Sequence, residues 1–260
     1  MTTKWQTFLL GGLAALSLLT LTSCTTSETG RHQLILLSKD QETQLGFTAF
    51  DQMKKEVPIS KNPQHNALVA KVGAQIAEQA KSKLPDAKWE FVVFDSKEAN
   101  AFCLPGGKVG VYSGLLDITQ TEAGLATVIG HEVAHASQHH GNERMSDAKV
   151  VHGVTEWAGS LASEKNQAVA RTAFGVVGKY AVELPFSRVH ESEADHVGLL
   201  YMARAGYNPE EAVRFWQRFS DAHKGQSQQP AFLRTHPLDA QRIADLQKWM
   251  PEAKAAMKTK

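Results

Sequence analysis

The sequence predicts an α+β fold in which helices dominate and one small β-sheet is kept apart from them. Apolar residues recur at helical spacing through most of the chain after residue 38. Between residues 88 and 112 the composition changes to aromatic and β-branched residues, which favour strands. The 260 residues are 42% hydrophobic and 21% charged, with no long run of one sign. This composition suffices for a packed domain and argues against a disordered chain.

The first 23 residues are expected to be an export signal. Lys4 precedes an apolar run over residues 8–21, and at about fourteen residues this run is shorter than the roughly 20 that span a membrane. The run ends in Leu-Thr-Ser-Cys24, which resembles a bacterial lipobox. We therefore expect a lipoprotein signal peptide over residues 1–23, with an ordinary secretory signal as the alternative.

Cys24 would then carry the lipid anchor. Acyl chains on its thiol and on the new N-terminal amine would give firm membrane attachment, where a single chain is marginal. Thr25 follows it, and in the lipoproteins that this segment resembles, a residue other than Asp there favours the periplasmic side of the outer membrane. The next residues are small and polar, so we expect the lipidated N-terminus and its tether to span residues 24–37. Residues 38–260 are expected to form the folded domain.

Periodicity places the remaining elements. Helices are expected over residues 38–56 and 66–83, followed by strands over 88–94, 101–103 and 108–112 with a turn at 105–107. Further helices are expected over residues 119–140, within 146–183, and over 190–205, 210–223 and 238–249. In the helix over 119–140, Thr119 and Glu122 have the spacing of a capping box, and Gly141 supplies a stop.

The pattern His131-Glu-Val-Ala-His135 lies inside this expected helix. Residues four apart lie about 40° apart around a helix, so both imidazoles can reach one metal ion. Glu132 lies one position on, where its carboxylate can approach a metal-bound water without binding the metal. Zinc lowers the pKa of bound water to roughly 7, which makes hydroxide available at neutral pH. The pattern therefore predicts a zinc site with Glu132 as general base.

A third ligand is expected on another element. Glu191 and Asp195 are four residues apart and share a helix face, so we assign Glu191 as the ligand. Asp195 would accept the free ring N–H of a ligating histidine and fix its tautomer. Glu193 points about 200° away from Glu191 and is expected to be a solvated surface acid.

Four motifs occur in the order that one family of zinc metallopeptidases shows. They are Asn100-Ala-Phe with Pro105-Gly-Gly-Lys-Val-Gly-Val-Tyr, Val128-Ile-Gly-His-Glu-Val-Ala-His, Arg188-Val-His-Glu-Ser-Glu-Ala-Asp-His, and Thr235-His-Pro with Arg242. The chain resembles the family that includes CaaX prenyl proteases, HtpX membrane proteases and periplasmic proteases of the LoiP and BepA kind, most closely the last group. The resemblance spans roughly residues 40–250. It implies a gluzincin-type fold with one helix carrying the histidines, another carrying the glutamate, and the small sheet beside the active-site cleft.

The resemblance also implies further site residues. Asn100, Ala101 and Phe102, with Val109 and Val111 of the following strand, would form the cleft wall that pairs with an extended substrate. His236 would either stabilise an oxyanion or occupy a fourth zinc position in a self-inhibited state. The remaining expectations are that Arg188 and Arg242 either brace the acidic residues or are solvated, that His139 and His140 are solvated, and that Cys103 is a small buried hydrophobe.

These features predict a zinc endopeptidase of the bacterial envelope that hydrolyses unfolded or misassembled proteins. One alternative is a chaperone or assembly factor for outer-membrane proteins whose protease site is latent, in contact with the assembly machinery. Another is a structural zinc lipoprotein. Removing Lys4 and the rest of the first 23 residues leaves 27 basic and 27 acidic residues out of the chain's 28 and 27, so nothing in the charge favours nucleic-acid binding.

Overall fold

The computed structural model describes residues 24–160, 186–223, 230–237 and 240–257. The expected signal peptide over residues 1–23 lies outside this part, and so do residues 161–183 of the expected helical region. Among the described helices, none is both long enough and apolar enough to cross a bilayer.

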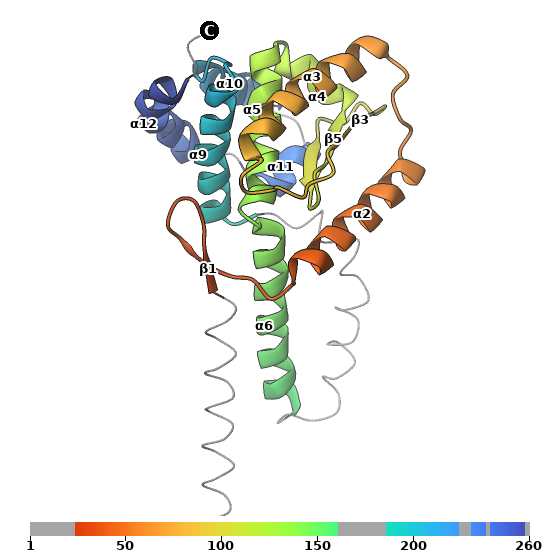
Figure 1. Cartoon of the computed structure of the whole chain (residues 1–260), viewed down its shortest axis with the longest axis vertical. Coiled ribbons are helices and arrows are strands. Elements are labelled where there is room, and N and C mark those ends of the chain that lie inside the picture. The colour runs from red at the N-terminus through yellow and green to blue at the C-terminus, as the bar shows by residue number, and fades with distance from the viewer. Residues whose placement is uncertain (1–23, 161–185, 224–229, 238–239, 258–260) are drawn as a thin grey trace, which may run out of the picture.

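The fold is mainly helical with a small sheet, which confirms the predicted α+β class (Figure 1). The elements in chain order are β1 (Cys24–Thr26), β2 (His32–Leu34), α2 (Lys39–Glu56), α3 (Pro63–Ala80), β3 (Glu90–Phe94), β4 (Ala101–Leu104), β5 (Lys108–Tyr112), α4 (Ser113–Thr119), α5 (Glu122–Ser137), α6 (His140–Ser160), α9 (Arg188–Arg204), α10 (Glu210–His223), α11 (Ala231–Thr235) and α12 (Ala240–Ala256). The short helices α4 and α11 and the β1–β2 pair were not predicted.

The larger sheet has the strand order β3-β5-β4, with β3 parallel and β4 antiparallel to the central strand β5. Gly106 and Gly107 have φ values of 82° and 84° in the turn from β4 to β5, a conformation that glycine adopts without strain. Phe50 of α2 packs edge-on against Phe94 and Phe102 at ring-centroid distances of 6.3 and 6.2 Å. This aromatic cluster fixes α2 beside β4.

Helix α5 is the central element, since every residue from Gly124 to Ser137 is buried. Two glycines allow α5 and α9 to approach closely. A Cβ atom on Gly198 would lie 2.7 Å from the backbone nitrogen of His131, and one on Gly130 would lie 2.9 Å from the carbonyl oxygen of Gly198. The histidine pattern is therefore held in backbone contact with the helix that carries Glu191.

The ends of α5 differ from those predicted. Thr121 is the N-cap and its side chain accepts the Gly124 N–H at 2.9 Å, whereas Thr119 ends the preceding helix α4. The chain turns at His139, whose φ is 55°, and a new helix begins directly afterwards. Gly141 therefore lies inside α6 and does not stop a helix. Residues 137–144 contain no large apolar side chain, so periodicity could not locate this break.

Residues 24–37 are folded against the body, which corrects the expectation of a tether. β1 and β2 pair as an antiparallel hairpin beside α6 (Figure 1). The Gln33 side chain is only 3% exposed and donates to the backbone oxygen of Gln138 at 2.6 Å. The Leu36 N–H donates to Ser146 Oγ at 2.9 Å. Polar anchors of this kind are invisible to a pattern of hydrophobicity, so the segment looked unstructured.

Candidate metal centre

Four buried side chains converge on one point. Donor atoms of His131, His135, Glu191 and His236 all lie within 4.8 Å of one another. His131 Nε2 lies 3.1 Å from His135 Nε2 and 3.2 Å from His236 Nδ1. Glu191 Oε1 lies 3.3 Å from His135 Nε2 and 3.0 Å from His236 Nδ1. Two helices, α5 and α9, and the residue that follows α11 thus supply one cluster.

The cluster fits a tetrahedral zinc ion. Ligand atoms at about 2.0–2.1 Å from zinc in tetrahedral geometry lie about 3.3–3.4 Å apart, close to the spacings here. Glu132 is 3% exposed, and its Oε1 atom has no hydrogen-bond partner although it lies 3.3 Å from His236 Nε2. A buried carboxylate oxygen without a donor needs a water or a cation, so the donor set requires a further occupant.

His131 is held by a carboxylate and an arginine. Its Nδ1 lies 3.0 Å from Asp195 Oδ1, and Arg242 of α12 donates to both oxygens of Asp195 at 2.7 and 2.8 Å. Arg242 Nη1 also lies 2.8 Å from Glu191 Oε2, and the guanidinium stacks 4.2 Å above the Trp216 ring. The side chain of Arg242 is thus buried against both acids. Of the two expectations, the structure places it as a brace.

Charges in the cluster shift its titration. Burial lowers the pKa of His131, but the carboxylates of Glu191 and Asp195 outweigh it and raise that pKa to about 9. Burial raises the pKa of Glu191, and the opposing charges of His236, His131 and Arg242 hold it well below the usual value. Two anionic carboxylates beside three imidazoles form a site for a cation.

Glu132 has a different environment. Burial raises its pKa, against the opposing influence of His236 and His131. A carboxylate with a raised pKa is better matched to proton transfer near neutral pH. Its position next to His131, with Oε1 facing the cluster 3.3 Å from His236 Nε2, is that of a general base.

His135 is held through a longer chain of contacts. Its Nδ1 lies 2.9 Å from His140 Nδ1, and His140 Nε2 lies 3.0 Å from Glu193 Oε2. Arg31 of the hairpin turn donates to the same Glu193 oxygen from Nε at 2.9 Å and from Nη2 at 2.8 Å. Burial lowers the pKa of His140 to about 4, so its ring is neutral.

These contacts correct two expectations. Glu193 is 4% exposed and His140 is fully buried, so neither is a solvated surface group. The helical argument that Glu193 points away from Glu191 holds, but the face to which it points is covered by the N-terminal hairpin.

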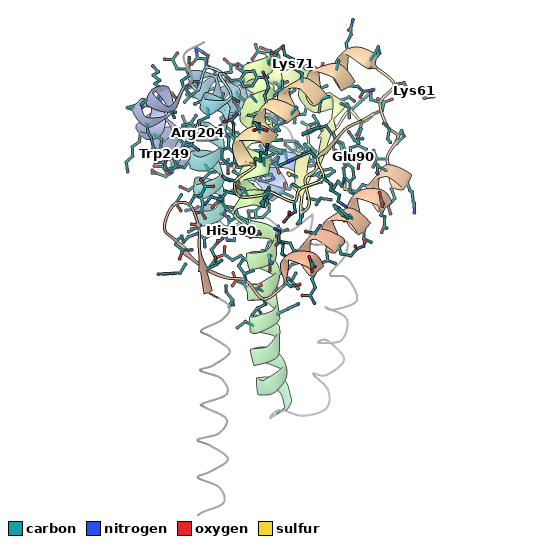
Figure 2. The ribbon with its side chains drawn as sticks, in the orientation of Figure 1. Lys61, Lys71, Glu90, His190, Arg204 and Trp249 are labelled. Atoms are coloured by element: carbon teal, nitrogen blue, oxygen red, sulfur yellow. The ribbon has the colours of Figure 1, made fainter. Side chains whose placement is uncertain are left out.

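His139 is half-buried and lies 3.0 Å from Glu42 Oε2. Figure 2 labels His190 at the end of α9 that faces α6, where its Nε2 lies 3.2 Å from Glu143 Oε2.

A pocket of about 270 Å³ opens beside the cluster. Glu132, His135 and His236 line it, together with apolar side chains of α2, the whole of β4 and the ring of Phe186, which stacks on His135 at 4.0 Å. Asn100, Ala101 and Phe102 also line this pocket, next to the edge of β4 that no described strand pairs with.

Val109 and Val111 are placed elsewhere. Both are fully buried in β5, which is hydrogen-bonded to a neighbour on each side. A central strand has no free backbone edge for a substrate, so the substrate-pairing expectation for these two residues is corrected.

Cys103 is half-buried, and desolvation raises the pKa of its thiol, which leaves it inert as a nucleophile. Arg188 is exposed at the start of α9.

Comparison with known proteins agrees with this site. Residues 63–250 match peptidase family M48. The mitochondrial metalloendopeptidase OMA1 of Schizosaccharomyces pombe is 35% identical over 69% of this chain and 52% of its own length. The β-barrel assembly-enhancing protease of Escherichia coli K12 is 29% identical over 80% of this chain and 44% of its own length. The mitochondrial OMA1 metalloendopeptidase of Bos taurus is 30% identical over 96% of this chain and 51% of its own length. The chain thus spans about half the length of these relatives.

Proposed function

The chain belongs to peptidase family M48, and from that premise we propose that it hydrolyses unfolded or misassembled proteins of a bacterial envelope. The matched residues, 63–250, include the whole donor cluster and Glu132. They form a zinc metalloendopeptidase centre. The single observation that carries the mechanism is the buried Glu132 carboxylate, which faces the cluster and lines the pocket.

The chain's own residues supply the proton transfers. Zinc, bound by His131, His135 and Glu191, would polarise the scissile carbonyl and lower the pKa of a water molecule. Glu132 removes the proton from the attacking water and then delivers it to the leaving amine nitrogen as the C–N bond breaks. The Asp195–Arg242 pair keeps the proton of His131 on Nδ1 and leaves Nε2 free as a donor atom.

The free edge of β4 supports the choice of unfolded substrates. Within the described residues, β4 pairs only with β5, and its other edge borders the pocket. An extended chain can add to such an edge through main-chain hydrogen bonds, with little dependence on sequence. A folded protein has its backbone groups already paired, so it cannot bind in this way. The substrate class that fits is therefore an unfolded polypeptide.

The test is cleavage of one protein in its folded and unfolded states by the zinc-loaded full chain. Glu132→Gln should keep zinc bound and lose about 10²- to 10⁴-fold in rate, the contribution of a general base. Glu78→Gln is the matched control because Glu78 is an exposed acid on α3 that pairs with Lys81, away from the metal cluster. Wild-type cleavage by Glu132→Gln, or equal cleavage of the folded and unfolded substrate, would contradict the proposal.

The envelope location rests on the segment that ends in Leu-Thr-Ser-Cys24. The similar proteins include mitochondrial enzymes as well as a bacterial one, so sequence similarity alone does not identify the cellular compartment. We propose lipidation of Cys24 and attachment to the periplasmic side of the outer membrane. Labelling with an alkyne fatty acid in a Gram-negative host, followed by membrane fractionation, tests this. Label on Cys24→Ser, or an unlabelled soluble wild type, would refute it.

A second candidate function is an assembly factor with a latent protease, and His236 favours it. Its Nδ1 lies among the other donor atoms, 3.0 Å from Glu191 Oε1, where it would be a fourth ligand. One Escherichia coli relative bears a name for enhancing β-barrel assembly, so outer-membrane assembly machinery is the partner to examine. His236→Ala should raise basal cleavage if the site is latent. It should lower cleavage if His236 stabilises the oxyanion.

A further inference from the structure

We infer that Arg31, in the N-terminal β1–β2 hairpin, is a positioning residue for the metal ligand His135 and acts on it through Glu193 and His140. The inference rests on the proposed zinc site. It goes beyond that site because it gives a segment outside the family-matched residues 63–250 a role in holding a ligand.

The two ligand histidines of α5 are supported in parallel ways. His131 Nδ1 meets Asp195, which is clamped by Arg242 through Nε and Nη2. His135 Nδ1 meets a carboxylate one imidazole further away, Glu193, which is clamped by Arg31 through the same two nitrogens. Each of these two series of side-chain contacts therefore ends in an arginine. One arginine comes from the C-terminal helix and the other from the N-terminal hairpin.

The direction of each hydrogen bond follows from metal binding. His135 Nε2 lies among the donor atoms, so it must carry a lone pair and the ring proton must be on Nδ1. That Nδ1–H donates to His140 Nδ1, which leaves the proton of neutral His140 on Nε2. His140 Nε2–H then donates to the Glu193 carboxylate. Only one tautomer of each ring satisfies this sequence, and the anion at its end fixes the choice.

Arg31 is what keeps that anion in place. The side chains of Glu193 and Glu143 are only 3% and 8% exposed, and the Arg31 guanidinium lies between them at 2.8 Å from Glu193 Oε2 and 2.7 Å from Glu143 Oε2. Thr29 of the same hairpin turn donates to the other Glu193 oxygen. Without Arg31, two nearly buried carboxylates would face each other without a shared cation. Glu193 would then be favoured to turn to solvent, and His140 would lose its acceptor.

The test measures metal binding in the purified full chain by competition with a chromophoric zinc chelator. Arg31→Ala should weaken zinc binding by about 10- to 100-fold, the usual effect of losing an outer-shell partner. The absorption spectrum of the cobalt-loaded protein should also change, because His135 is free to rotate. Arg31→Lys keeps the charge but loses the two-pronged contact, so its affinity should lie between those of Arg31→Ala and the wild type.

Lys39→Ala is the matched control. Lys39 lies soon after the hairpin in the sequence, but it pairs with the exposed Asp86 and not with the residues that connect Arg31 to His135. A second check is coupling. Glu193→Gln and Arg31→Ala act along one path, so the double variant should bind zinc about as well as the weaker single variant. Wild-type zinc affinity and cobalt spectrum in Arg31→Ala, or fully multiplicative effects, would overturn the inference. If Arg31→Ala does not fold, wild-type affinity in Arg31→Lys would overturn it. Because these readouts follow metal and not cleavage, failure here is distinct from failure of the proposed function.

Discussion

The close contact of α5 and α9 allows one perturbation to be worked through from the structure. A methyl group added by Gly198→Ala would meet the His131 nitrogen at 2.7 Å, the Gly130 carbonyl carbon at 2.8 Å and the His131 Cα at 2.9 Å. Comfortable contacts between such atoms are about 3.5–4.0 Å, so the two helices must separate by about 0.7–1 Å. The atoms that must move are backbone, which cannot rotate away.

The expected result is a damaged metal site in a folded protein. Metal ligands tolerate displacements of about 0.2 Å, and Glu191 of α9 would move relative to both histidines of α5. A misplacement near 1 Å costs about 10²-fold in rate, so we expect a loss of that order in cleavage, with weaker zinc binding. Stability should fall by about 1–3 kcal/mol from overpacking, partly offset by about 1 kcal/mol of helix propensity.

The assay combines zinc affinity, peptide cleavage and thermal unfolding. Gly141→Ala is the control, because Gly141 lies in α6 and a Cβ atom there would meet nothing within 4 Å. That variant should keep its zinc affinity and gain about 0.5–1 kcal/mol of stability, while its cleavage is not used as a control because Gly141 also lines the pocket. Full zinc affinity and cleavage in Gly198→Ala would refute the argument that backbone contact between α5 and α9 holds the ligands in register.

Three further outcomes are expected. Asp195→Asn should weaken zinc binding by about 10- to 100-fold in a chelator competition, and unchanged affinity would contradict its role at His131. Phe50→Ala should lower the free energy of unfolding by about 3–5 kcal/mol in urea, because the ring is fully buried among Phe94 and Phe102, and a negligible change would show that α2 is not held by this cluster. Burial would raise the pKa of Glu193, but hydrogen bonds from His140, Thr29 and Arg31 outweigh it and lower the value to about 2 from the usual 4.5. The stability that Glu193 contributes is therefore complete above pH about 4.5 and is lost as the pH falls toward 2, and unfolding curves across this range that show no such loss would contradict the pairing.

Local pattern was enough to predict the helices that carry the site. Helices such as α2 and α3 show apolar residues at helical spacing, and β3 and β5 are rich in aromatic and β-branched residues. Both patterns depend only on residues close together in the sequence, so they can be recognised without tertiary information. His131 and His135 are linked by helix geometry alone. Glu191 and Asp195 were placed on one face by the same geometry, and the structure brings both to the cluster.

The rest depended on contacts between distant segments. Glu193 was correctly predicted to point away from Glu191, but nothing near it in the sequence shows that Arg31 covers that face. Valine is common in both edge strands and central strands, so Val109 and Val111 do not show from the sequence which kind of strand they form. Only the pairing of β5 with a strand on each side identifies it as a central strand. The adjacent pair His139–His140, next to a conformational break, was the one local signal that could have suggested a support for His135.

The two arginine clamps make the site depend on two segments that are far apart in the sequence. Arg242 lies in α12, and Arg31 lies in the turn between β1 and β2. Both segments must therefore dock against α5 and α9 before each ligand histidine has its full support. Proteolytic loss of the hairpin or of α12 would remove one support while leaving every ligand residue in the chain, so hydrolytic competence would depend on an intact polypeptide.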